Sequence, residues 1–348
     1  MYRKFLRPLL FTLKPETIHN IIISLLKLLF AIPLVPQIVS RMYKVRDPRL
    51  QRNFMGITFD NPVGMAAGFD KNAEVFEEFS HFGFSFIEIG TVTPLPQPGN
   101  PKPRSFRLPK DQALINRMGF NNQGVDQTIK NLKNRKSQVV VGGNIGKNTE
   151  TPNDKALDDY VTAFNKIYDH VDYVVINLSC PNIKNLNELQ DKAHTMEILN
   201  ELIRLRNTRQ VEKPILLKIS PDLDNQQLDE VVELFFSTGI DAVIATNTTI
   251  QRNVLTTEPD MVENIGAGGL SGKPLHKRST EIIRYLSEKS NGQIPIIGVG
   301  GVMTPEDALE KISAGATLVQ VYTGFIYNGP GFVKKINKEI ARRSSEES

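Results

Sequence analysis

Eight short apolar runs recur between residues 63 and 322, and stretches with helical periodicity separate them. Alternating strand and helix units imply a parallel sheet, and eight units within about 285 residues fit a closed (β/α)8 TIM barrel better than an open doubly wound sheet. No GxGxxG motif follows the first run, which weakens the open-sheet alternative further. The predicted strands are residues 63–67, 84–92, 139–145, 173–178, 215–219, 242–247, 294–298 and 317–322.

Helices are expected between these strands, for example over residues 157–168, 196–206, 228–237 and 306–314. The last of them follows Thr304 and Pro305, which suit an N-cap and a first helical position. The stretch 93–123 is longer than a usual connection and rich in proline, so we expect it to pass over one end of the barrel.

Polar residues lie at or just after the C-terminal end of each predicted strand. In a barrel these ends converge on one mouth, where active sites are built, so residues far apart in sequence are expected to share one pocket. They are Lys71, Thr91, Asn144, Asn177, Lys218, Asn247, Gly301 and Thr323.

Glycines cluster after the last two strands, in Gly298–Gly301 and at Gly324. Such glycines can serve tight turns, but on adjacent final strands they favour the phosphate site that recurs in this fold. Substrate phosphates and the phosphate of FMN both bind there in barrels, and glycines alone do not separate them.

Lys218 is the only charged residue in the apolar run 215–219. A buried lysine is costly without a negative partner. It could form a Schiff base, pair with a structural carboxylate, or stabilise negative charge on a cofactor ring. Converging asparagines at 144, 177 and 247 suit a planar, amide-rich ligand, because each offers a donor and an acceptor.

Cys180 is the only cysteine in 348 residues and follows the strand 173–178 within the sequence NLSCPN. A single cysteine excludes an internal disulfide framework and a CxxC metal site. Most lone cysteines are inert, but the position beyond the strand end favours a functional thiol. The histidines have no metal-ligand spacing, so no metal site is expected.

The N-terminus combines basic residues at Arg3, Lys4, Arg7 and Lys14 with the apolar run 21–30. That run is about half the roughly 20 residues a spanning helix needs, and no signal-peptide cleavage site follows it. Helices are expected from Pro15 and over residues 36–43. They could form a cap on the barrel or a hairpin lying in a bilayer surface; the residues leave both open. A net charge of +4, without basic runs interleaved with aromatics, does not indicate nucleic-acid binding.

Several long strings follow one another along the chain: GMAAGFDK at 64–71, NRMGFN at 116–121, ATNTT at 245–249, GGLSG at 268–272 and IGVGG at 297–301. In this order they resemble dihydroorotate dehydrogenases, and the membrane-associated, quinone-reducing class 2 in particular. The resemblance covers essentially the whole chain, and the N-terminal helical extension is the hallmark of that class.

The resemblance implies one FMN across the barrel mouth, with Lys218 stabilising the anionic reduced flavin. Positions matching the family's FMN site are Ala67, Gly68, Phe69, Asp70, Lys71, Thr91, Asn144, Asn177, Lys218, Thr246, Gly272, Gly301, Tyr322 and Thr323. Positions matching its dihydroorotate site are Lys71, Asn116, Arg117, Met118, Gly119, Phe120, Asn177, Asn182, Asn247 and Thr248. His19 and Arg107 match residues near the quinone head.

The implied reaction is the oxidation of (S)-dihydroorotate to orotate in pyrimidine (UMP) biosynthesis. A base removes the C5 proton, FMN accepts the hydride from C6, and ubiquinone or menaquinone reoxidises the flavin. Class 2 enzymes usually carry serine where this chain has Cys180, whereas soluble class 1 enzymes carry cysteine. We therefore expect Cys180 to act as the base in a class 2 body.

The expected organisation is a helical membrane and quinone-tunnel segment at residues 1–44 and an FMN-binding catalytic barrel at 45–348. The resemblance implies a monomeric peripheral protein on the cytoplasmic face of a bacterial inner membrane. Two alternatives remain at this point: a class 1-like enzyme with a soluble acceptor such as fumarate, and a phosphate-binding aldolase or isomerase that uses Lys218. A non-catalytic barrel on a membrane surface would leave Lys218 and the asparagines unexplained.

Overall fold

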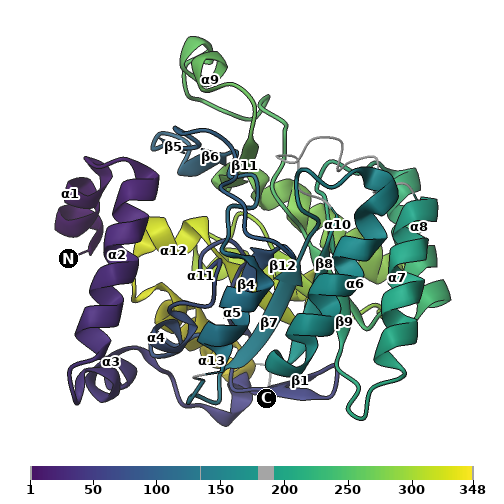
Figure 1. The fold of residues 1–348 in the computed structure, drawn as a ribbon. Helices are drawn as coiled ribbons and strands as arrows, with labels where there is room; N and C mark the ends of the chain where they lie inside the picture. The colour runs from purple at the N-terminus through teal and green to yellow at the C-terminus, as the bar shows by residue number, and fades with distance from the viewer. Residues whose placement is uncertain (1, 134, 179–191, 347–348) are drawn as a thin grey trace.

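A closed barrel of eight parallel strands forms the centre of the molecule (Figure 1). The computed structural model describes residues 2–133, 135–178 and 192–346. Successive barrel strands pair in parallel, and the last pairs with the first through Val319 and Val63, which confirms the predicted TIM barrel. The barrel strands are β3 (Val63–Met65), β4 (Phe86–Val92), β7 (Val140–Ile145), β8 (Tyr173–Asn177), β9 (Ile215–Ile219), β10 (Ala242–Ala245), β12 (Ile296–Val299) and β13 (Leu318–Val321).

Helices surround the barrel, and those predicted between the strands are confirmed. Capping boxes start two of them, at Asp224 before α8 and at Thr304 before α11, because each cap side chain accepts a backbone N–H that the helix leaves unpaired. The helices are α4 (Phe76–Ser80), α5 (Gly124–Leu132), α6 (Ala156–Ile167), α7 (Lys192–Arg206), α8 (Asn225–Thr238), α10 (His276–Lys289), α11 (Pro305–Ser313), α12 (Thr323–Asn328) and α13 (Phe332–Glu346).

The barrel strands are buried on both faces, which is why they read as continuous apolar runs. The hairpin of β1 (Arg52–Phe54) and β2 (Ile57–Phe59) adds Phe59 to the barrel interior, where its ring lies 5.3 Å from that of Phe86 at the start of β4. This apolar packing fills the end of the barrel at which the strands begin. The opposite end is left for polar side chains.

The stretch 93–123 contains the hairpin β5 (Ser105–Leu108) and β6 (Ala113–Asn116). The distant strand β11 (Gly269–Gly272) extends it to a three-stranded antiparallel sheet through β6. Figure 1 shows this sheet beyond the barrel mouth, with α9 (Pro259–Ile265) projecting furthest. The predicted excursion over the mouth is therefore an ordered sheet.

The N-terminal helices stack along one side of the barrel (Figure 1). They comprise the π-helical segment η1 (Tyr2–Leu6), α1 (Arg7–Phe11), α2 (Pro15–Phe30) and α3 (Val35–Tyr43). The predicted start at Pro15 is confirmed. Within the described residues no single helix is long and apolar enough to cross a membrane, although the bent pair Tyr2–Phe11 and Pro15–Phe30 reaches that length and composition together.

Candidate active site

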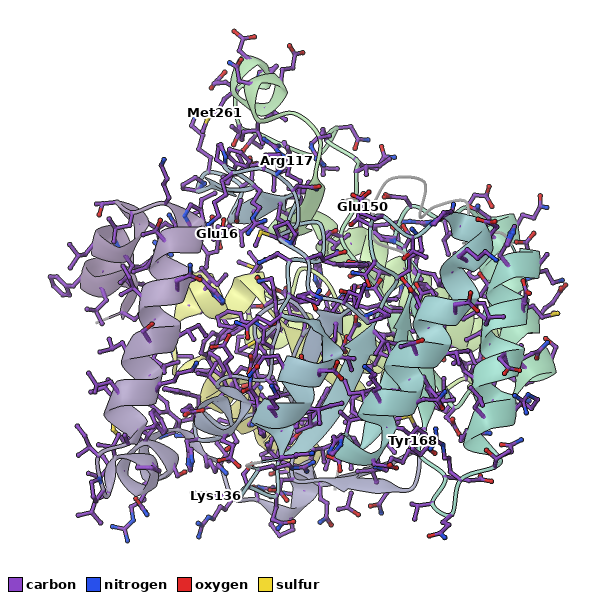
Figure 2. All side chains as sticks on the ribbon, viewed as in Figure 1. Glu16, Arg117, Lys136, Glu150, Tyr168 and Met261 are labelled. Atoms are coloured by element: carbon purple, nitrogen blue, oxygen red, sulfur yellow. The ribbon has the colours of Figure 1, made fainter. Side chains whose placement is uncertain are left out.

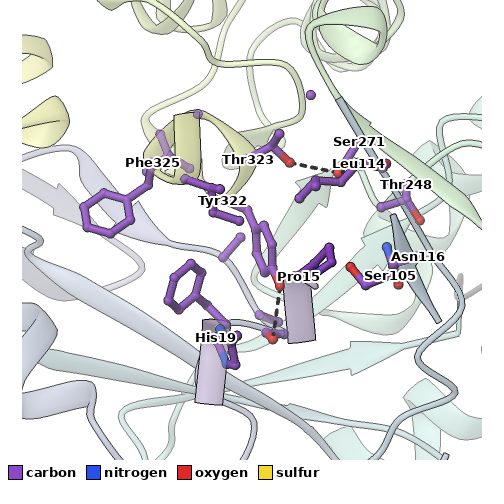
Figure 3. Close-up of a pocket in the computed structure, with 18 of the residues that line it drawn as sticks. Pro15, His19, Ser105, Leu114, Asn116, Thr248, Ser271, Tyr322, Thr323 and Phe325 are labelled. Atoms are coloured by element: carbon purple, nitrogen blue, oxygen red, sulfur yellow. Dashed lines mark hydrogen bonds between the residues drawn. The ribbon is translucent and has the colours of Figure 1, made fainter. Parts of the chain in front are cut away.

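One cavity of about 590 Å³ joins the barrel mouth to the N-terminal helices, a volume within the range of small-molecule sites. Figure 3 shows residues from both sides of it: His19 and Pro15 come from α2, whereas Tyr322 and Thr323 follow β13. The predicted convergence of the strand ends on a shared pocket is thus present in the structure.

A chain of side-chain amides runs across the mouth. Thr91 Oγ1 donates to Asn144 Oδ1 (2.6 Å), and Asn177 Nδ2 donates to Thr91 Oγ1 (2.9 Å). Asn247 Nδ2 extends the chain to Asn177 Oδ1 at 3.3 Å. Because these bonds fix the orientation of each amide, the chain presents a rigid pattern of donors and acceptors to a ligand.

Lys218 lies on β9 with its Nζ 3.1 Å from Oε1 of Glu88 on β4, and both side chains are almost wholly buried. The Glu88 carboxylate also accepts hydrogen bonds from Asn144 Nδ2 (2.7 Å) and Gln320 Nε2 (2.5 Å). Of the partners considered for Lys218, the structure shows a carboxylate. The three donors around the Glu88 carboxylate compensate its charge inside the barrel.

Lys71 and Asp70 follow β3 and have different surroundings. Lys71 lines the cavity, and burial lowers its pKa to about 8, with Glu16 opposing and Arg104 adding to this effect. The Asp70 carboxylate instead accepts the backbone N–H groups of Glu74 (2.7 Å) and Val75 (2.8 Å). Burial raises the pKa of Asp70 to about 6 despite these bonds. Asp70 therefore holds the turn that presents Lys71.

Two glycines bring backbone to the cavity wall where no other residue fits. Gly301 has a φ of +73°, and a Cβ there would lie 2.3 Å from backbone atoms of His276. Gly272 has a φ of +98°, and its Cβ would lie 2.4 Å from the Gln112 carbonyl oxygen. Next to them, Ser271 and Thr323 hydroxyls are 2.8 Å apart (Figure 3). This part of the wall consists of backbone and small hydroxyl side chains.

The end of the cavity near α2 is apolar, apart from a few polar groups. The His19 ring packs edge-on against Phe69 at 5.1 Å between centroids. Burial, and then the charge of Lys71, lowers the pKa of His19 to about 3, so its imidazole is neutral at physiological pH. The Arg107 guanidinium donates to the Leu13 carbonyl at 2.6 Å and lies 4.4 Å from the centroid of the Phe11 ring. Apolar residues around them are Leu6, Leu10, Ile18, Ile22, Leu25 and Leu26.

Most of the residues predicted for the cofactor, substrate and quinone line this one cavity. They are Ala67, Gly68, Phe69, Lys71, Thr91, Asn177, Lys218, Thr246, Gly272, Gly301, Tyr322, Thr323, Asn116, Met118, Gly119, Phe120, Asn247, Thr248, His19 and Arg107.

Three of the predicted residues do not line the cavity. Asp70 and Asn144 are buried behind it, in the contacts described above. Arg117 turns its guanidinium to the carbonyls of Ile265 (2.5 Å) and Ala267 (2.8 Å), which fastens the segment carrying α9 (Figure 2). Cys180 and Asn182 lie outside the described residues.

Sequence reasoning did not find Glu88, Glu16 or Gln320, which the structure places at or next to the site. A signal for Glu88 existed: it is the one charge in the run 86–92, just as Lys218 is the one charge in 215–219. Opposite charges in two buried strands of one barrel favour a pair.

Known proteins similar to this chain share one name. A family model described as dihydroorotate dehydrogenase matches residues 49–343. A relative from Christiangramia forsetii, named dihydroorotate dehydrogenase (quinone), is 52% identical over 343 residues, which cover 99% of each chain. A relative with the same name from Idiomarina loihiensis is 46% identical and covers 95% of this chain and 98% of its own.

Solved structures agree with these relatives. The crystal structure of DHODH from Eimeria tenella in complex with ferulenol has a TM-score of 0.84 and 37% identity, covering 96% of this chain and 92% of that one. Its ligand-free form has a TM-score of 0.82 and 38% identity, covering 91% of this chain and 96% of that one.

Proposed function

The chain belongs to the dihydroorotate dehydrogenase family and is a quinone-dependent enzyme of it, and from this we propose its cofactor, its base and its route to the quinone. The proposal is that dihydroorotate is oxidised to orotate for pyrimidine biosynthesis. FMN is the resident electron carrier, Cys180 is the base, and a membrane ubiquinone or menaquinone is the final acceptor.

The observation that carries this proposal is the change in polarity along the 590 Å³ cavity. The barrel mouth presents amides, hydroxyls and Lys218, whereas the α2 end presents aliphatic side chains around His19 and Arg107. A polar carboxylate substrate and an apolar quinone require such opposite surroundings. A flavin between the two ends would be within reach of both.

The residues present fit FMN. A Cβ on Gly68 would have only the Tyr322 ring within 4 Å, at 3.6 Å, so the backbone there faces open cavity. The donors and acceptors of Asn177 and Thr246 suit the amide edge of a flavin ring. Glycines 272 and 301 and Thr323 would hold the phosphate, as expected for the last strands of this fold. When bound, FMN supplies two-electron redox chemistry.

Lys218 would supply a fixed positive charge where the reaction develops negative charge. Its bond to Glu88 holds the ammonium group in place before substrate arrives. The same bond weighs against the aldolase alternative, because it ties the Lys218 amine to the Glu88 carboxylate at 3.1 Å, whereas a Schiff-base lysine must have its amine free to attack a substrate carbonyl.

Dihydroorotate would bind between the amide chain and the segment 116–120. Asn116, Asn177, Asn247 and Thr248 line that part of the cavity, and Lys71 provides a cation for the substrate carboxylate. The Asn182 amide is assigned to the same site from the sequence. Cys180, which follows β8, would remove the C5 proton as a thiolate.

The quinone would enter from the side of α2 and meet His19 and Arg107. A neutral imidazole can donate one N–H to a quinone oxygen without adding a buried charge. Arg107 adds a permanent cation near the same end, anchored on the carbonyl of Leu13.

Residues 1–44 would form the membrane and quinone segment and residues 45–348 the catalytic barrel. Large apolar side chains stay exposed on the N-terminal helices and the turns between them, as on helices that lie in a bilayer surface. We place this surface on the cytoplasmic face of a bacterial inner membrane, where the basic residues of the segment would meet headgroups. The exposed residues are Phe5, Leu9, Leu13, Ile21, Leu25, Leu28, Ile32, Leu34, Ile38 and Met42.

The test is a spectrum followed by an acceptor comparison on the full chain. We expect a flavin absorbance spectrum, its bleaching by dihydroorotate, and its recovery with a short-chain ubiquinone or menaquinone analogue. Recovery with fumarate but not with quinone would support the class 1-like alternative. A protein without a flavin spectrum after loading with FMN would contradict the cofactor assignment.

A further inference from the structure

An ion pair between a buried arginine and a partly exposed glutamate joins helix α2 to the stretch that covers the barrel mouth. Arg104 is 5% exposed, and its Nη2 donates to Glu16 Oε1 at 2.7 Å while its Nε reaches Oε2 at 3.2 Å. Such two-point contacts fix direction as well as distance. Figure 2 shows Glu16 on the side of α2 that faces the barrel.

The rest of the Arg104 guanidinium holds the mouth-covering stretch in a turn. Its Nη1 donates to the carbonyls of Pro98 (2.5 Å) and Asn100 (2.9 Å). One side chain therefore fastens both α2 and the turn at 98–100.

Asn100 in turn holds the segment proposed to bind dihydroorotate. Its backbone N–H donates to the Met118 carbonyl (3.1 Å), and its Nδ2 donates to the Arg117 carbonyl (3.0 Å). Gly119 packs so closely that a Cβ there would lie 2.8 Å from the Asn100 side chain. A shift of Arg104 would thus be passed to residues 116–120.

Glu16 belongs to the quinone end of the cavity. It lies in the first turn of α2, three residues before His19, and so on the same side of that helix. Burial alone would raise the pKa of Glu16, but the hydrogen bonds and charges of Arg104 and Lys102 lower it below its usual value. The carboxylate is therefore a permanent anion in this pair. Lys102 is a minor partner, at 3.3 Å with its side chain 64% exposed.

We propose that the Glu16–Arg104 pair positions the dihydroorotate-binding segment relative to helix α2, so that a residue of the quinone end sets the affinity for dihydroorotate. Glu16 and Arg104 are positioning residues in this proposal, which rests on the function proposed above. Through this pair the N-terminal extension would contribute to dihydroorotate binding at the barrel mouth.

The chain offers two matched controls. Lys27 on α2 pairs with Glu74, which lies outside the stretch 98–121. Lys27→Gln therefore removes an ion pair of α2 and leaves the Glu16–Arg104 pair intact. Lys102→Gln removes the exposed partner of the same Glu16 carboxylate. Any effect of Glu16→Gln that neither control shows belongs to the Glu16–Arg104 pair.

The experiment measures steady-state kinetics of the FMN-loaded full chain with dihydroorotate and a short-chain ubiquinone. For Glu16→Gln we expect the KM for dihydroorotate to rise by about tenfold, as for the loss of one charged hydrogen bond, with kcat within about twofold. Both lysine controls are expected to keep the wild-type KM for dihydroorotate. Glu16→Asp keeps the charge but shortens the reach, so its KM should lie between.

A Glu16→Gln enzyme with the wild-type KM for dihydroorotate would overturn the proposal, even if its KM for quinone changed. If this variant does not fold, Glu16→Asp decides by the same criterion. A rise in KM shared equally by Lys27→Gln would also overturn it, because any loosening of α2 would then suffice. Wild-type protein that turns over neither substrate would instead refute the proposed function.

Discussion

The Nζ atom of Lys218 lies 3.1 Å from Oε1 of Glu88, and this contact crosses the barrel interior from β9 to β4. The two residues are 130 positions apart in the chain. Asn144 and Gln320 add hydrogen bonds to the same carboxylate, so four strands contribute to one charged network. Lys218 therefore lines the cavity, where a ligand can meet it, while Glu88 compensates its charge within the fold.

Replacing Glu88 by glutamine should destabilise the protein strongly, by about 3–5 kcal/mol, because it leaves a buried ammonium group without its counter-charge. Urea unfolding at pH 7 measures this loss. The double variant Glu88→Gln with Lys218→Met is expected to recover part of it, since neither charge of this pair then remains. If the double variant is no more stable than Glu88→Gln, the cost does not come from the unpaired lysine.

Replacing Cys180 should change the pH dependence of flavin reduction by dihydroorotate. A free cysteine titrates near 8.5, far below a serine hydroxyl, so Cys180→Ser should react more slowly at pH 7 and need higher pH to approach its full rate. Stopped-flow measurement of flavin bleaching from pH 6 to about 10 tests this. An unchanged rate in Cys180→Ala would remove Cys180 from the role of base.

Alkylation gives a separate test of the same thiol. We expect iodoacetamide to inactivate the enzyme and orotate to slow that inactivation, because the function proposed above puts Cys180 against the bound substrate. Mass spectrometry of the modified peptide identifies the site. Inactivation at the same rate with and without orotate would place Cys180 away from the substrate.

His19 should make the protein less stable in acid. Its pKa is about 3 in the folded protein and 6.5 without the surrounding structure. Between these values the unfolded chain binds more protons, so the contribution of His19 to the free energy of unfolding falls as the pH drops from 6.5 towards 3. His19→Asn should lose less stability than the wild type between pH 7 and pH 5, as measured by urea unfolding. Equal losses in the two proteins would contradict the buried neutral imidazole.

Lys311 on α11 should make the free energy of unfolding depend on pH in the alkaline range. It is fully buried, donating to the hydroxyls of Ser279 (2.5 Å) and Thr280 (3.1 Å), and burial lowers its pKa to about 7, although Asp307 and Glu310 oppose this. The unfolded lysine keeps its proton up to about 10.5, so the free energy of unfolding should rise with pH from 7 upward.

Lys311→Met should remove that rise, because methionine fills similar space without a proton to lose. Comparing the thermal midpoints of the two proteins at pH 7 and pH 9 measures the difference. The same pH response in both would show that Lys311 keeps an ordinary pKa in the folded protein.

The barrel could be predicted from the sequence because its signals are local. Each buried strand is a continuous apolar run, and caps such as Thr304 mark where helices begin. The sheet over the mouth could not be predicted, because β6 pairs with β11, which lies more than 150 residues later. The sequence of neither strand indicates which strand it pairs with. Non-local pairing leaves no periodic trace in either segment.

The candidate site was predictable as a set of positions, but not as a set of side-chain directions. The family strings brought Lys71 and Asn116 to the cavity, yet Asp70 and Arg117, from the same strings, turn to backbone groups. Direction depends on which neighbours offer a partner. Glu88 was missed for the related reason that its partner lies across the barrel.

Because Arg104 is buried and pairs with Glu16 on α2, the barrel depends on the N-terminal helices for a counter-charge. The two parts are therefore expected to be kept together in evolution. A descendant that lost residues 1–44 would keep the buried Arg104 with its anion, Glu16, gone. Deletion of the extension alone would therefore be selected against even where no membrane or quinone is needed. A soluble descendant would have to acquire a new carboxylate, or replace position 104, before it could discard the helices.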